Sequence, residues 1–192
     1  MKQATSFIAF IVISTIAWAI PVINNKHATV GSDSSLVLFT SMQQMLLQVT
    51  TVTGGNEVYE LKEADVLNME TMISRKKRYI VYNPAFITKL NELTKNKWSV
   101  ITLLAHEIGH HTKGHTTRRG GSNPEVELEA DEFAGSVMYK LGATLQEAQN
   151  VMYFIARKED SKTHPSRSAR LSAIEKGWKH AAEQEMVAIP EN

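Results

Sequence analysis

The chain has 192 residues, of which 43% are hydrophobic and 21% charged, and its formal net charge is +1. This length accommodates one domain with a substantial core, and the near-neutral charge, without a basic tract or a glycine-rich phosphate loop, argues against nucleic acid and nucleotides as partners. Cysteine is absent, so disulfides and thiolate ligands are excluded, and any metal site must be built from histidine and carboxylate side chains.

The N-terminal segment has the pattern of an export signal. Lys2 supplies a positive charge, residues 7–20 are almost wholly apolar, and Ala17-Trp18-Ala19 provides the small-x-small pattern that signal peptidase cleaves. The apolar run of 14 residues is shorter than the roughly 20 that span a bilayer as a helix. We therefore expect residues 1–19 to be a cleaved signal peptide and residues 20–192 to form one domain in the periplasm or outside the cell. An uncleaved N-terminal anchor is the alternative, and a membrane would be contacted only through this segment.

A first helix and a small sheet are expected next. Residues 34–50 have apolar positions at helical spacing, and Gly54-Gly55 ends this pattern. Strand-like runs follow at residues 57–66 and 78–82, and the polar residues 75–78 are expected to form a solvated hairpin turn. These runs predict a small antiparallel sheet.

The remainder of the chain is predicted to be helical. Asn123-Pro124 is a typical helix start, and Thr144 with Glu147 forms a capping box that opens another helix. The fold class is therefore a mainly helical α+β domain. Helices are expected at residues 84–93, 98–113, 124–140 and 144–157, with a last helix from about His164-Pro165 that turns Leu171, Ile174 and Trp178 inward.

The expected helix at residues 98–113 contains the most informative motif, H-E-x-x-H. His106 and His110 are four residues apart and project from one helix face, so their imidazoles can bind one Zn²⁺. Glu107 lies beside them and is placed to act on a metal-bound water. His111 and His115 are also four apart, but no acidic residue lies between them and they project from a different face, so solvent-exposed or supporting roles are expected for them.

A catalytic zinc site commonly has three protein ligands and leaves a fourth position for water. Glu127 and Asp131 share a helix face, and if Glu127 binds the metal, Asp131 can accept the second ring N–H of a ligand histidine and fix its tautomer. Glu129 points elsewhere, and neither Glu125 nor Glu129 has a comparable partner. The sequence therefore predicts one zinc ion per chain, bound by His106, His110 and Glu127.

This pattern resembles the gluzincin zinc endopeptidases of the CAAX prenyl protease and HtpX family. The resemblance rests on H-E-x-x-H at residues 106–110 followed by E-x-x-A-D at residues 127–131, and it covers roughly residues 60–175. It implies a zincin-like fold, with Glu127 as the third ligand. Large family members span the membrane several times, whereas this chain resembles the short, single-domain exported members, so prenylated substrates are not implied.

The resemblance also implies roles toward substrate for three residues. His164, followed by Pro165, and Arg170 correspond to the family's His-Pro segment and arginine, which contact substrate or the developing oxyanion. His164 is accordingly expected to be catalytic. Asn68 corresponds to the asparagine of the family's edge strand, where substrate pairs in extended form.

Together these residues predict a zinc-dependent metalloendopeptidase that hydrolyses extended or unfolded polypeptides outside the cytosol, with a role in envelope protein quality control. The alternative is a non-hydrolytic zinc-binding carrier or adaptor module. The intact Glu107 argues against that alternative, because such a protein needs the ligands but not the base.

Overall fold

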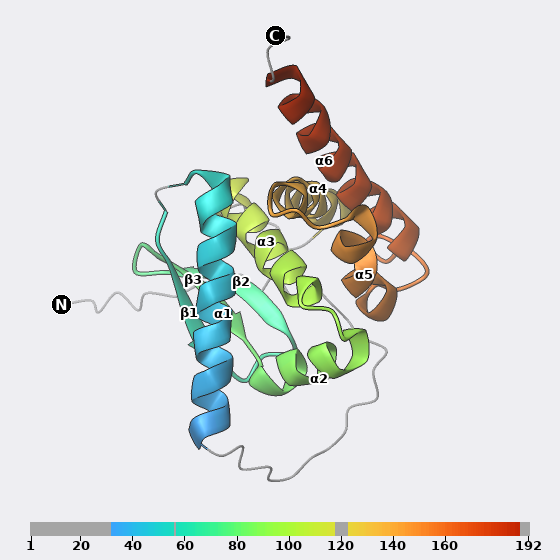
Figure 1. Ribbon diagram of the computed structural model, residues 1–192. Helices are drawn as coiled ribbons and strands as arrows, with labels where there is room; N and C mark the ends of the chain where they lie inside the picture. The colour runs from blue at the N-terminus through green and yellow to red at the C-terminus, as the bar shows by residue number, and fades with distance from the viewer. Residues whose placement is uncertain (1–31, 56, 118–122, 189–192) are drawn as a thin grey trace, which may run out of the picture.

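The computed structural model describes residues 32–55, 57–117 and 123–188 (Figure 1). The mainly helical α+β fold is confirmed in these residues. The predicted signal peptide, residues 1–19, lies outside them, and among the helices that are described none combines the length and apolar character needed to cross a bilayer.

Each predicted helix has an observed counterpart, and the sheet contains one strand that the sequence did not predict. The elements are α1 (Ser32–Thr53), β1 (Tyr59–Glu63), β2 (Met69–Ser74), β3 (Lys77–Tyr82), α2 (Pro84–Thr94), α3 (Trp98–Thr112), the 3-10 helix η1 (His115–Thr117), α4 (Pro124–Lys140), α5 (Leu145–Ile155) and α6 (Arg167–Ala188).

The sheet has the strand order β1-β3-β2 and is mixed. β2 and β3 form an antiparallel hairpin, and its turn residues Arg75 and Lys76 have φ values of 49° and 65°, as a tight two-residue hairpin turn requires. The predicted turn is therefore confirmed at Arg75 and Lys76, whereas Lys77 and Arg78 belong to β3, and the turn joins β3 to β2 and not to β1. β1 pairs with β3 in parallel, from Tyr59 opposite Arg78 to Glu63 opposite Tyr82. This corrects the expectation of an antiparallel sheet: β2 reverses the chain once and the hairpin reverses it again, so β3 runs in the direction of β1.

Helix α3 is the central element of the fold (Figure 1). It contacts β2 and β3, and α1, α2, α4 and α5 also pack against it. Every residue from Ser99 to His111 is buried. A helix that is buried on all sides has no solvent face, so the polar residues of the H-E-x-x-H motif are enclosed by the fold.

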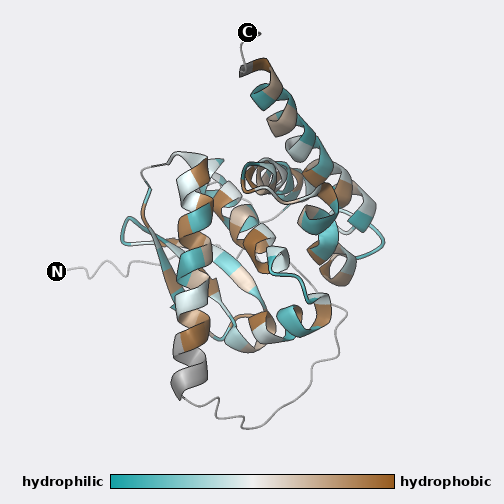
Figure 2. Cartoon of the chain, viewed as in Figure 1, coloured by the Kyte–Doolittle hydropathy of each residue, from teal (hydrophilic) through white to brown (hydrophobic). Residues whose placement is uncertain are grey.

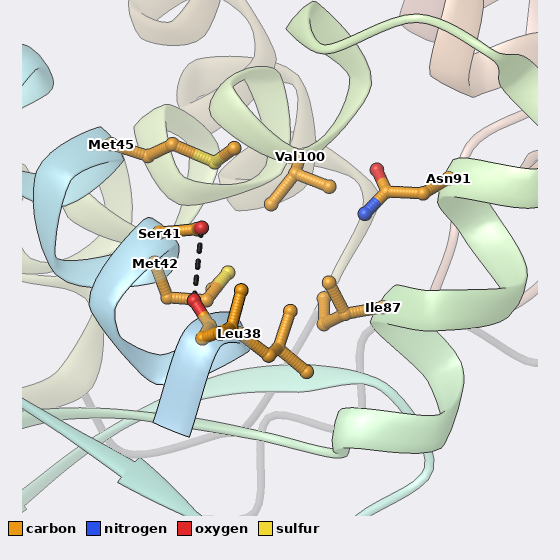
Figure 3. Close-up of a pocket in the computed structure, with 8 residues that line it drawn as sticks. Leu38, Ser41, Met42, Met45, Ile87, Asn91 and Val100 are labelled. Carbon is orange, nitrogen blue, oxygen red and sulfur yellow. Dashed lines mark hydrogen bonds between the residues drawn. The ribbon is translucent and has the colours of Figure 1, made fainter. Parts of the chain in front are cut away.

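Helix α1 covers part of this core, and hydrophobic and hydrophilic residues alternate along it (Figure 2). Its buried residues Met42 and Val49 belong to the core. A mainly apolar groove of about 490 Å³ lies between α1 and α2 (Figure 3). It is separate from the predicted site, because none of its lining residues is a predicted site residue. These residues are Val37, Leu38, Ser41, Met42, Met45, Ile87, Asn91 and Val100.

Helices α4 and α6 pack closely because glycines lie where they meet. A Cβ atom at Gly135 would overlap the backbone carbonyl of Ile174, and one at Gly177 would overlap that of Glu132. The close approach is needed by the site, since α6 carries Arg170 and α4 carries its partner, Asp131.

Candidate metal centre

The site forms where α3 packs against α4, and Gly109 makes the approach possible. Gly109 lies between the two histidines of the motif, and a Cβ atom there would be 3.2 Å from Cα and O of Ala130 and 3.1 Å from the ring of Phe133. A side chain at this position would push the two helices apart. The glycine inside the motif therefore helps to set the distance between the histidines and the acidic residues of α4.

The start of α4 is set by local sequence. The side chain of Asn123 accepts hydrogen bonds from the backbone amides of Glu125 and Val126, at 3.0 Å and 3.2 Å, and Pro124 occupies the first helical position. An asparagine cap followed by proline fixes where a helix begins. Glu127 then lies in the first turn and is fully buried.

The structure brings His106, His110 and Glu127 together. One potential ligand atom from each lies within 4.8 Å of the other two, and this is the only such group among the residues that the structure describes. The two histidine Nε2 atoms are 3.0 Å apart, and the carboxylate oxygens of Glu127 lie 3.6 Å from each of them. All three residues are 0% exposed.

Asp131 and Arg170 lie behind His106. Nδ1 of His106 is 2.9 Å from Oδ1 of Asp131, and a carboxylate at this distance accepts the Nδ1 proton, which leaves the lone pair on Nε2. Arg170 donates to both oxygens of Asp131, at 2.6 Å from Nε and 2.7 Å from Nη2. The four-residue spacing of Glu127 and Asp131 thus places both near His106, as the helical pattern indicated.

His115 and Glu129 lie behind His110. Nδ1 of His115 is 2.9 Å from Nδ1 of His110, and Nε2 of His115 is 2.8 Å from Oε2 of Glu129. The expectation that Glu129 lacks a partner was therefore wrong. It failed because His115 follows the end of α3, where Gly114 adopts a φ of 71° and helical spacing no longer applies. The sequence contains one indication of this contact: a histidine lies five residues after His110, directly after Gly114.

The charges around the cluster favour a cation. Burial lowers the pKa of His106, but the charge and hydrogen bond of Asp131, together with Glu127, raise it to about 10. Burial raises the pKa of Glu127, yet the hydrogen bond and charge of His106, with the charge of Arg170, lower it to about 2. Burial and the charge of His106 lower the pKa of His110 to about 3, so this imidazole is neutral.

The donor set fits a divalent metal ion. The Nε2 atoms of His106 and His110 lie 3.0 Å apart with the Glu127 carboxylate beside them, and a metal that displaces the proton from His106 would find a lone pair on Nε2, since Nδ1 of this ring faces Asp131. Three buried potential ligand atoms within 4.8 Å of one another favour a cation between them. Two imidazoles and one carboxylate form a ligand set of catalytic zinc sites, which keep a further position open.

Glu107 is enclosed beside this cluster and is 1% exposed. Burial raises its pKa to about 8; the charge of His106 lowers it, while the charges of Glu127 and Glu70 raise it. Its Oε2 atom has no hydrogen-bond partner among the described residues. A carboxyl group with a pKa near neutrality and an unengaged oxygen is suited to proton transfer.

Asn68 lies at the start of the sheet edge nearest the cluster. It immediately precedes β2, an edge strand that contacts α3, and its backbone carbonyl accepts the amide of Asn83 at 2.8 Å. Its side chain is buried. Glu70, on β2, influences Glu107 electrostatically, so this strand passes close to the motif.

The two residues expected to contact substrate or oxyanion lie in different settings. His164 is in the connection between α5 and α6, where its Nδ1 is 2.6 Å from the hydroxyl of Thr163 and its amide donates to the hydroxyl of Ser161. Arg170 is 2% exposed and is engaged by Asp131. Nη2 of Arg170 is also 4.0 Å from Oε2 of Glu127 and 3.4 Å from Nδ1 of His106, so Arg170 contacts the proposed ligands as well as Asp131. The roles of His164 and Arg170 toward substrate remain predictions.

Comparison with known proteins supports a metallopeptidase. The model of peptidase family M48 matches residues 122–177, which include Glu127, Asp131, His164 and Arg170 but not the H-E-x-x-H motif. The match indicates a metallopeptidase and supports a zinc metalloprotease family. Neither the curated proteins nor the solved structures gave a match.

Proposed function

We propose that this protein is a zinc-dependent metalloendopeptidase. The observation that carries the proposal is the buried cluster of His106, His110 and Glu127, with the carboxyl group of Glu107 enclosed beside it. The family match over residues 122–177 supports the same activity and is independent of the motif, which lies outside the matched range.

The metal ligands, Glu107 and His164 are each proposed to have a separate role in catalysis. His106, His110 and Glu127 would hold the zinc ion, which when bound would supply Lewis-acid chemistry: a lower pKa for water and a polarised scissile carbonyl. Glu107 removes a proton from the attacking water and delivers it to the leaving amine, a role that its burial beside the ligands and its unengaged Oε2 atom support. His164 is proposed to stabilise the oxyanion by a hydrogen bond.

Extended polypeptide is the proposed substrate. β2 is an edge strand and contacts α3, so a substrate strand could pair with its backbone beside Glu107. Asn68 lies at the beginning of this edge. Main-chain pairing gives affinity with little side-chain selectivity and accepts the middle of a chain, which supports endopeptidase action on unfolded proteins.

We further propose an exported location and a role in envelope protein quality control. The N-terminal sequence pattern, with Lys2 followed by the apolar residues 7–20, supports this location. N-terminal sequencing of the mature protein tests it: a start near Ile20 supports cleavage, and an intact Met1 supports an anchored form.

Metal content and casein hydrolysis of the wild type, Glu107→Gln and Glu127→Ala test the activity. The wild type should contain one zinc ion per chain and degrade casein. Glu107→Gln should retain zinc but lose at least about 10²-fold in rate, because the base is gone and the ligands remain. Glu127→Ala should lose both zinc and activity.

Two results would contradict the proposal. Casein degradation by Glu107→Gln at the wild-type rate would overturn the mechanism. Tight zinc binding by the wild type without cleavage of a broad panel of unfolded proteins would favour the carrier or adaptor alternative.

A further inference from the structure

His115 and Glu129, which belong neither to the proposed ligands nor to the H-E-x-x-H motif, form a hydrogen-bonded supporting chain behind His110. His115 lies 2.9 Å from His110, Nδ1 to Nδ1, and Glu129 lies 2.8 Å from Nε2 of His115. We propose that His115 and Glu129 are positioning residues that hold His110 in the tautomer and orientation that bind metal. This inference rests on the proposed zinc centre and deepens it.

A neutral imidazole carries one N–H proton, and the position of this proton decides which ring nitrogen can bind a metal. Nδ1 of His110 and Nδ1 of His115 are within hydrogen-bond distance, so one of these atoms donates and the other accepts. His110 can offer Nε2 to a metal only when its proton is on Nδ1. His115 must then accept at Nδ1 and keep its own proton on Nε2.

Glu129 selects that arrangement. A carboxylate only accepts hydrogen bonds, so its position 2.8 Å from Nε2 of His115 requires the proton on that nitrogen. This leaves Nδ1 of His115 as the acceptor for His110. The Glu129 carboxylate thus determines the tautomer of His115, and the tautomer of His115 determines that of His110.

The two ligand histidines are therefore supported in different ways. His106 donates directly to the buried carboxylate of Asp131, whereas His110 donates to the ring of His115, which is itself held by Glu129. The side chain of His115 is 1% exposed and that of Glu129 is 39% exposed. The chain thus runs from the buried ligand to a carboxylate at the surface, where a substitution disturbs little packing.

Zinc affinity of the full chain, measured by chelator competition, tests this proposal. His115→Phe removes the acceptor and should weaken zinc binding by roughly 10- to 100-fold, the usual effect of losing a partner that orients a ligand. His115→Gln restores an acceptor oxygen and should recover part of the affinity. Glu129→Gln should have a smaller effect than His115→Phe, because its amide oxygen can still accept from Nε2.

Matched controls separate positioning from folding. Glu125→Gln removes the same charge from the same helix at an exposed residue and should leave zinc affinity unchanged. Thermal unfolding of each variant without metal shows whether it folds. Because Glu129 is proposed to act only through His115, adding Glu129→Gln to His115→Phe should cause no further loss of zinc affinity.

Imidazole ¹⁵N NMR of the zinc-loaded wild type gives a direct readout of the tautomers. We expect His110 to be protonated on Nδ1 and His115 on Nε2. Protonation of His115 on Nδ1, or equal zinc affinity of folded His115→Phe and the wild type, would overturn the supporting chain while the zinc centre stands. Absence of zinc binding by the wild type would overturn the chain and the proposed function together.

Discussion

Arg170 and Asp131 form a buried, bidentate ion pair directly behind His106. The guanidinium donates to both carboxylate oxygens at 2.6 Å and 2.7 Å, with Asp131 0% and Arg170 2% exposed. The pair joins α6 to α4, and through the 2.9 Å contact between Asp131 and Nδ1 of His106 it extends to α3. The packing of the last helix is thereby coupled to the orientation of a ligand histidine.

Arg170→Ala should destabilise the metal-free protein by about 3–5 kcal/mol, because it leaves the carboxylate of Asp131 buried without its cation. Arg170→Lys keeps the charge but cannot make two parallel hydrogen bonds, so its loss should be smaller and still clear. Urea denaturation in the presence of chelator measures both. Stability of folded Arg170→Ala equal to that of the wild type would show that the pair contributes nothing.

The helices were predictable because the residues that start them act locally. Asn123 and Thr144 accept backbone amides of their own first turns, and such caps depend on neighbouring residues alone. β2 was not predicted because its pattern does not follow its burial: Thr71 is polar and buried, whereas Ile73 is apolar and 38% exposed. Its place is set by pairing with β3 and contact with α3, which no local pattern contains.

In the site, too, the arrangements within one helix were predictable, whereas a contact between two elements was not. The spacing of His106 and His110, and of Glu127 and Asp131, follows from helical periodicity within one element. The contact between His115 and Glu129 joins a 3-10 turn to another helix, across 14 residues, so no periodicity indicates it. Only the packing of α3 on α4 brings these last two together.

Zinc binding should raise the free energy of unfolding, and this gain should depend on Glu127 as a ligand. A ligand that binds only the folded state at about 100 times its dissociation constant adds about 2.7 kcal/mol. Glu127→Gln should lose most of this gain, because its amide is a weaker ligand than the carboxylate, whereas Glu125→Gln should keep it. Thermal unfolding with and without zinc measures the effect, and an equal gain for Glu127→Gln would remove this residue from the ligand set.

The metal-free protein should lose stability as the pH rises from about 6.5 to about 10. The pKa of His106 is raised from 6.5 to about 10, because Asp131 and Glu127 outweigh the burial that lowers it. In this window the folded state binds more protons than the unfolded state, so the free energy of unfolding falls as the pH rises. Glu107, whose pKa is raised by burial from 4.5 to about 8, contributes in the same direction up to that pH.

Urea denaturation between pH 6 and pH 10, with chelator present, measures this loss. His106→Gln removes the titrating group and should flatten the decline above pH 8, where Glu107 no longer contributes. Zinc should oppose the decline, because its binding takes the place of the proton on His106 and strengthens as the pH rises. A decline above pH 8 that persists unchanged in His106→Gln would assign it to another group.

Gly177→Ala should destabilise the protein strongly, because a Cβ atom would overlap the backbone carbonyl of Glu132 and force α6 away from α4. Overpacking of this kind costs about 1–3 kcal/mol or more, which exceeds the gain of about 1 kcal/mol in helix propensity. Ser172→Ala, at an exposed position of the same helix, is the control and should change stability by no more than about 0.5 kcal/mol.

Gly109→Ala is expected to affect metal binding more than stability. Its Cβ atom would meet backbone atoms of Ala130 at 3.2 Å, and because backbone in a helix cannot rotate away, α4 must shift relative to α3. The cost of this shift and the helix-propensity gain of about 1 kcal/mol oppose each other, so the metal-free protein should remain folded. The Glu127 oxygens, which lie 3.6 Å from both ligand nitrogens, would move with α4. Chelator competition should therefore show weaker zinc binding, and unchanged affinity in a folded Gly109→Ala protein would show that the helix spacing does not set the geometry of the centre.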